Sequence, residues 1–106
     1  MALPPALTPE QRLAALEKAA AVRRQRAELK DKLKMGSLNL AELLEQAERD
    51  EVVGRTKVVV VLESLPGLGK VKARRLMEAL NISESRRIQG LGRNQRDALL
   101  EQFHQR

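Results

Sequence analysis

The sequence predicts an all-α protein, a long N-terminal helix followed by a compact helical domain, and three observations lead to that class. No helix-breaking residue stands between Pro9 and Gly36. Two glycine turns, at residues 67–69 and 90–92, each precede a segment of helical length. The β-branched run at residues 58–62 has no second strand candidate, and a lone strand cannot form a sheet. We expect an N-terminal arm and basic helix over residues 1–36 and a helical domain over residues 37–106.

The first helix follows an apolar arm, Met1–Leu7. Thr8 as the N-cap, Pro9 at the first helical position and Gln11 three residues beyond the cap are typical of a capping box. A helix from here to Gly36 has about 27 residues and a length of about 40 Å, too long for so small a domain to cover. Its first half carries an apolar stripe, and an arginine cluster in its middle is expected to project from the body: Arg23, Arg24 and Arg26.

The second helix is predicted to be acidic and to run from Asn39 to Gly54. Asn39 as N-cap and Glu42 at N3 form a capping box, and the buried face consists of leucines at positions 40, 43 and 44. The carboxylates at positions 45, 48, 50 and 51 have no His or Cys nearby, so we interpret them as a solvated face rather than a metal or catalytic site.

The third segment, residues 55–63, is β-branched but is predicted to be a helix. A helix places Val58, Val61 and Leu62 on one side, where they can be buried. It forms the first arm of a hairpin whose second arm contains Leu76, Met77 and Leu80. Ser83 or Ser85 then caps a short turn that leads to the second glycine turn.

The first glycine turn, Leu65-Pro66-Gly67-Leu68-Gly69-Lys70, has the chemistry of a phosphate-binding loop. Gly67 and Gly69 allow positive φ and close approach of the backbone to a ligand. Free amides at the start of the following helix attract anions, and Lys70, Lys72, Arg74 and Arg75 add positive charge. A simple helix connection is the alternative. A nucleotide-binding P-loop does not fit, because position 64 is serine and position 71 is valine.

The second glycine turn repeats the first after 23 residues. Gly90, Leu91, Gly92 and Arg93 match residues 67–70, and the downstream apolar positions match as well: Leu76 with Leu99, Met77 with Leu100 and Leu80 with Phe103. We interpret the repeat as two stacked turn-helix units that present two phosphate-binding loops side by side.

Composition narrows the ligand to duplex nucleic acid. The net charge is +6, divided as +4 over residues 1–34, −4 over residues 35–53 and +6 over residues 54–106. Single strands are usually bound by stacking on aromatic rings, whereas this chain has one Phe and no Tyr or Trp. The absence of Cys excludes disulfides and thiolate metal sites. No apolar run reaches membrane-spanning length, and no cofactor is expected.

The residues from Leu65 to Ala73 resemble the helix-hairpin-helix motif. Over nearly the whole chain, the Leu-Thr-Pro-Glu-Gln-Arg opening, the Arg-rich first helix, residues 62–70 and residues 82–92 resemble the actinobacterial integration host factor family. That resemblance implies a monomeric, cytoplasmic, nucleoid-associated protein with an S13-like helix-two-turns-helix core. Such a protein would bind and bend duplex DNA with little sequence preference, affect its topology and assist phage integrase-mediated recombination.

The resemblance also implies which residues contact DNA. The phosphate-binding loop corresponds to Pro66, Gly67, Leu68 and Gly69 with the cations that follow, and the second contact region to Ser85, Arg86, Arg87 and the turn Gly92-Arg93-Asn94. Gln89 departs from the family, where a basic residue is frequent. We expect the Arg23, Arg24 and Arg26 cluster to contact a second stretch of backbone, so that binding both stretches requires a bent duplex; a solvated helix face is the alternative.

Other functions remain open at this point. DNA glycosylases also use a helix-hairpin-helix, but their catalytic Asp follows the hairpin at a spacing that falls near Gln89 here, and Asp97 is expected to be a surface residue. A module that binds RNA or the ribosome is the stronger alternative, since similar two-turn helical units contact RNA. A helical adaptor that binds protein through its acidic helix is the third.

Overall fold

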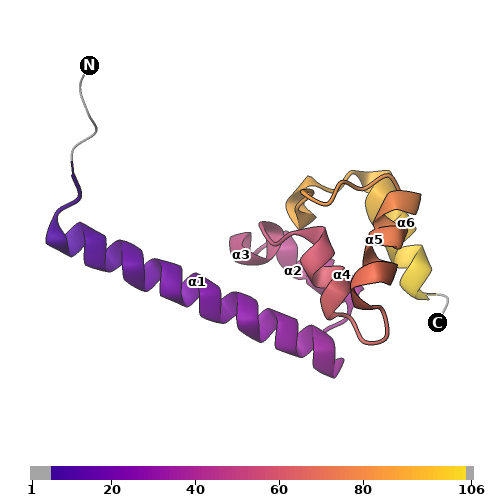
Figure 1. Ribbon diagram of the computed structural model, residues 1–106, viewed down its shortest axis with the longest axis horizontal. Helices are drawn as coiled ribbons and strands as arrows, with labels where there is room; N and C mark the ends of the chain where they lie inside the picture. The colour runs from indigo at the N-terminus through magenta and orange to yellow at the C-terminus, as the bar shows by residue number, and fades with distance from the viewer. Residues whose placement is uncertain (1–5, 105–106) are drawn as a thin grey trace, which may run out of the picture.

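The longest helix, α1 (Pro9–Met35), lies along one side of a group of shorter helices (Figure 1). The chain continues through α2 (Leu40–Ala47), α3 (Glu51–Gly54), α4 (Val58–Ser64), α5 (Gly69–Ala79), the 3-10 helix η1 (Ile88–Gly90) and α6 (Arg93–His104). This computed structural model describes residues 6–104, so residues 1–5 of the expected arm lie outside the described residues. No strand occurs within residues 6–104, which confirms the all-α class.

Both ends of α1 form as the sequence predicts. The Thr8 hydroxyl accepts a hydrogen bond from the Gln11 amide at 3.1 Å, and the Gln11 side-chain oxygen accepts one from the Thr8 amide at 3.0 Å. This reciprocal pair satisfies two amides that the helix itself leaves unpaired. At the other end Gly36 adopts a φ of +76°, the left-handed conformation that commonly ends a helix.

Only the C-terminal half of α1 is packed against the rest of the protein. Leu29 and Leu33 are its buried residues, and the helix contacts α3 and α4. Leu13 and Leu16 are 58% and 60% exposed. Figure 1 shows the N-terminal half extending beyond the other helices, so the apolar stripe of this half is uncovered among the described residues.

The predicted single helix from Asn39 to Gly54 is wrong, because the chain forms two helices there. The predicted capping box of Asn39 and Glu42 begins α2. The helix ends at Ala47, and Asp50 then acts as a new N-cap, with its carboxylate accepting a hydrogen bond from the Val52 amide at 2.9 Å. A carboxylate that competes for backbone amides in this way interrupts a helix that sequence periodicity alone would continue.

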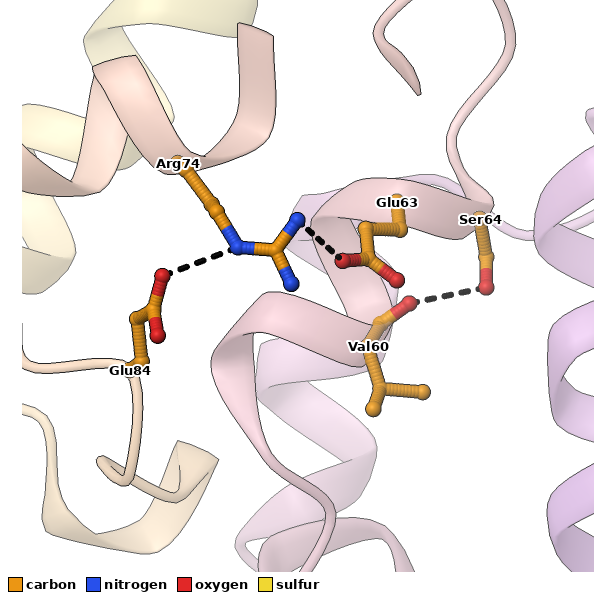
Figure 2. A network of polar contacts seen from close by, with 5 residues as sticks. All are labelled: Val60, Glu63, Ser64, Arg74 and Glu84. Carbon is orange, nitrogen blue, oxygen red and sulfur yellow. Dashed lines mark hydrogen bonds and ion pairs between the residues drawn. The ribbon is translucent and has the colours of Figure 1, made fainter. Parts of the chain in front are cut away.

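The β-branched run forms a helix, α4, as predicted, although the helix begins at Val58 instead of residue 55 and extends to Ser64. Val58, Val61 and Leu62 are at most 1% exposed, so one side of the helix faces the core. Ser64 donates a hydrogen bond from its hydroxyl to the Val60 carbonyl oxygen at 2.8 Å in the last turn (Figure 2). Helices α4 and α5 pack against each other as the two arms of the predicted hairpin.

The packing confirms that the matched apolar residues of the 23-residue repeat are core residues. Its matched residues from both turn-helix units lie in one core or pack directly against it: Leu76, Met77, Leu80, Leu99, Leu100 and Phe103. The same core contains buried leucines and valines of α1, α2 and α4. Within residues 6–104 no helix combines the length and the apolar character needed to cross a bilayer.

Candidate nucleic-acid interface

Residues 65–69, which connect α4 with α5 and include the first residue of α5, are called the glycine loop here. Its two glycines adopt left-handed conformations, with φ of +78° at Gly67 and +74° at Gly69. A Cβ atom built on either would meet nothing within 4 Å, so the requirement for glycine is conformational, and the space above the loop is open. Leu65 and Leu68 are buried and anchor the loop to the core.

The glycine loop leaves a group of backbone amides without partners. The Leu68 amide donates to the Leu65 carbonyl at 3.4 Å, whereas no hydrogen bond within the described chain reaches the amides of Gly67, Gly69, Lys70 or Val71. No side chain caps the start of α5. Unpaired amides together with the positive end of a helix dipole form an anion-binding site.

The cations after the glycine loop differ in their availability. Lys70 and Lys72 are exposed. Arg74 is paired within the protein, since its guanidinium lies 2.9 Å from a Glu84 carboxylate oxygen and 3.6 Å from one of Glu63. Figure 2 shows the arginine between the two carboxylates. Arg74 therefore connects α5 with α4 and with the loop that carries Glu84.

Residues 83–87, called the arginine loop here, bring together the second set of predicted contacts. The Ser83 hydroxyl accepts a hydrogen bond from the Ser85 amide at 3.1 Å, and Arg86 donates to the Gly90 carbonyl at 3.0 Å. Ser85, Arg86 and Arg87 line one cavity of about 350 Å³ together with Gln89. The loop thus presents two hydroxyls and two guanidinium groups to a single surface.

The second glycine turn does not repeat the geometry of the first. Neither Gly90 nor Gly92 has a positive φ. The amides of Gly90 and Leu91 donate to backbone carbonyls of Arg87 and Ile88, and the Gly92 amide donates to the Gln95 side-chain oxygen at 3.1 Å. The expectation of two equivalent phosphate-binding loops is therefore wrong, because the second turn has already used its amides.

The start of α6 contains the Gly92-Arg93-Asn94 turn that is expected from the sequence to form part of the second contact region. The Arg96 amide donates to the Gly92 carbonyl at 2.9 Å, which places Gly92 at the N-cap. Arg93 and Asn94 follow in the first turn of the helix, and both are exposed. Their backbone amides lie in the first turn of α6, where amides have no hydrogen-bond acceptor within the helix.

The arginine cluster of α1 is exposed, but it does not project from the body as a unit, because it is divided between two environments. Arg26 lines a groove of the body, opposite the arginine loop. Arg23 and Arg24 lie closer to the uncovered half of the helix. Sequence reasoning missed three further cations of that groove, Lys30, Arg55 and Lys57, although the four-residue spacing of Arg26 and Lys30 places both on one helix face.

The acidic side chains of the described residues do not gather into a metal site. No group of three His, Cys, Asp or Glu side chains within them is placed to bind a metal ion. Glu84 is paired with Arg74, and Asp97 is exposed on α6.

Helices α4 and α5, with the loops that follow them, lie within the part of the chain that identifies the class of protein. Residues 33–103 match the S13-like H2TH domain family. A solved structure, described as sIHF bound to an 8bp palindromic DNA, is 53% identical and superposes with a TM-score of 0.79. The superposition covers 82% of this chain and 98% of that chain.

Full-length relatives give a narrower assignment. Proteins named integration host factor are 58% identical in Streptomyces coelicolor and 61% identical in both Mycolicibacterium smegmatis and Mycobacterium tuberculosis. The matches span 97–99% of this chain and 95–99% of the relatives. The chain belongs to this integration host factor family, as its sequence motifs predict.

Proposed function

We propose that this protein binds the sugar-phosphate backbone of duplex DNA with little sequence preference, as a nucleoid-associated architectural protein. The observation that carries the proposal is the likeness to a DNA-bound structure at 53% identity and a TM-score of 0.79. The unpaired amides of the glycine loop supply a physical reason, because they suit a phosphate and read no base.

Each predicted contact has a role in this proposal. Gly67, Gly69 and Lys70 donate amides to a phosphate, Pro66 and Leu68 fix the loop, and Lys70 and Lys72 add charge. Ser85, Arg86 and Arg87 contact neighbouring phosphates, as do Arg93 and Asn94. Gly92 acts through the fold as the N-cap residue of α6, since its amide is bonded to the Gln95 side chain. Arg74 acts through the fold, by connecting the glycine loop's helix with the arginine loop.

Bending of the duplex is expected because the loops and the α1 arginines contact it at separate places. The glycine loop and the arginine loop belong to the helical body, whereas Arg23 and Arg24 are exposed near the middle of α1, beside the half of that helix that extends beyond the body. Binding at both places favours a duplex that curves toward α1, so preference follows DNA deformability more than base identity.

The proposal extends to the cellular role by membership of the family. The protein acts as a monomer in the cytoplasm, on the nucleoid, without catalysis and without a cofactor. It assists site-specific recombination by presenting bent DNA to an integrase–DNA complex.

The test is a comparison of nucleic acids of equal length. Fluorescence anisotropy with a random-sequence DNA duplex, single-stranded DNA and duplex RNA should show tightest binding to the DNA duplex. End-to-end energy transfer in a doubly labelled duplex should increase on binding, because the ends approach as DNA bends. Equal or tighter binding of duplex RNA would instead support the RNA-binding alternative.

A further inference from the structure

A basic groove lies between α1, the turn that connects α3 with α4, and the arginine loop. Its cavity has a volume of about 230 Å³, and five cations line it: Arg26, Lys30, Arg55, Lys57 and Arg87. The other lining residues are Thr56 and Val60, so no carboxylate is among them. Arg55 has its charge compensated outside the groove by Glu51, at 2.6 Å.

The backbone forces two of these cations together. Lys57 and Arg87 face each other across an antiparallel β-bridge. The Val58 amide donates to the Arg86 carbonyl at 2.9 Å, and the Ile88 amide donates to the Thr56 carbonyl at 2.9 Å. Like charges directly opposite each other on paired backbones are destabilising.

Nothing in the described chain compensates this repulsion. The side chains of Arg26, Lys30, Lys57 and Arg87 make no hydrogen bond or ion pair within residues 6–104. Four unpaired cations from three separate segments, around one cavity without a carboxylate, form a site that an anion would stabilise.

The size and position of the groove indicate which anion. Its volume is below the roughly 300–1,000 Å³ typical of pockets for whole small molecules, which favours a phosphate group over a free nucleotide. Helix α4 begins after Lys57 and ends at the glycine loop, so its seven residues separate the two sites by about 10 Å. One DNA strand advances about 3.4 Å along its axis per phosphate, so a strand could reach both sites within a few nucleotides.

We propose that the basic groove binds a backbone phosphate of the same duplex that the glycine loop contacts, with Lys30 and Lys57 as new contact residues. This inference rests on the proposed function. The groove thereby connects two contacts that are distant in sequence, the arginine loop and the arginine cluster of α1.

The first test uses lysine variants and a matched control. Lys30→Gln and Lys57→Gln should each weaken binding to a random-sequence duplex by about three- to tenfold and lower the slope of log affinity against log salt by roughly one unit. The control is Lys32→Gln, which removes the same charge from α1 but lies beside Glu28 and Asp50 on another face. Its affinity and slope should equal those of the wild type.

A second readout separates a binding role from a structural role. Because Lys57 faces Arg87 without a counter-ion, Lys57→Gln should leave the melting temperature of the free protein unchanged or raise it. Adding inorganic phosphate should raise the melting temperature of the wild type more than that of Lys57→Gln. A lower melting temperature for Lys57→Gln without DNA would mean that the lysine supports the fold, and would overturn the proposal.

The outcomes also distinguish this inference from the proposed function. A wild type that binds duplex DNA while Lys30→Gln and Lys57→Gln match Lys32→Gln would overturn the groove alone. A wild type that does not bind duplex DNA would overturn the proposed function, and this inference with it. Salt slopes lowered by all three variants would show a nonspecific effect of charge and would also overturn the groove.

Discussion

At the scale of single residues, two glycine turns with the same letters adopt different backbones for different reasons. Gly67 has a positive φ with open space where a Cβ would stand. Gly90 does not have a positive φ. A Cβ built there would lie 3.3 Å from the Arg86 side chain, which donates a hydrogen bond to the Gly90 carbonyl. The first turn therefore needs glycine for its conformation, whereas the second has only a close approach of the Arg86 side chain to Gly90.

Substitution of Gly67 tests the conformational requirement. Gly67→Ala places a Cβ in the left-handed region at a cost of about 1–2 kcal/mol, and the strain displaces the amides of the glycine loop. Duplex affinity should fall at least about tenfold, equivalent to the loss of one hydrogen bond to a charged group. Anisotropy gives the affinity, and urea unfolding gives the stability.

Gly36 provides the matched control for that substitution. Its φ is +76° and a Cβ there would also meet nothing within 4 Å, so Gly36→Ala suffers comparable strain at the end of α1. It should lose similar stability while its affinity for DNA stays at the wild-type value. Equal losses of affinity in both variants would show that the glycine loop matters only for folding.

At the scale of elements, helix signals in the sequence predict most of the structure. The capping residues Thr8 and Asn39 set the starts of α1 and α2, and the absence of a pairing partner makes the β-branched run a helix. The break at residues 48–50 could not be predicted, because Asp50 competes for a backbone amide that helical periodicity assigns to the helix. Nor could the basic groove, since chain folding brings its cations together from three segments.

The packing of α4 predicts where stability resides. Leu62 is fully buried, so Leu62→Ala should lower the free energy of unfolding by about 2–5 kcal/mol through lost burial and a cavity. Val71→Ala, at a position 64% exposed in α5, should change it by less than about 0.5 kcal/mol. Urea unfolding measures both; similar values for the two would contradict the described core.

The uncovered half of α1 predicts a local effect at Thr8. Thr8→Ala removes the N-cap bond and should cost about 1 kcal/mol of helix stability. Because this half contributes no buried residue, amide hydrogen exchange should accelerate in the first turns of α1 while the melting temperature of the body is unchanged. A fall in the melting temperature of several degrees would mean that the whole helix is coupled to the core.

At the scale of the whole molecule, α1 makes the protein much longer than its core. The principal extents are 53 × 34 × 26 Å. At about 3.4 Å per base pair, the longest extent corresponds to about 16 base pairs of duplex. A short duplex bound at the glycine loop therefore leaves Arg23 and Arg24 with less DNA to contact.

Duplex length tests this reach. A variant with both Arg23→Gln and Arg24→Gln should bind a 20-base-pair duplex with a salt slope lower by roughly two units than that of the wild type. On an 8-base-pair duplex, about 27 Å long, the difference in slope should be smaller, because fewer phosphates can lie beside α1 while the glycine loop is occupied. The same loss on both lengths would place these arginines at the core contact instead of beyond it.

Binding of a DNA phosphate by the unpaired amides of the glycine loop can be observed through amide chemical shifts during titration with a random-sequence duplex. The amide signals of Gly67, Gly69 and Lys70 should shift strongly as DNA is added. The Gly92 amide, already bonded to Gln95, should shift less. Unchanged signals at Gly67, Gly69 and Lys70 in a protein saturated with DNA would contradict the account.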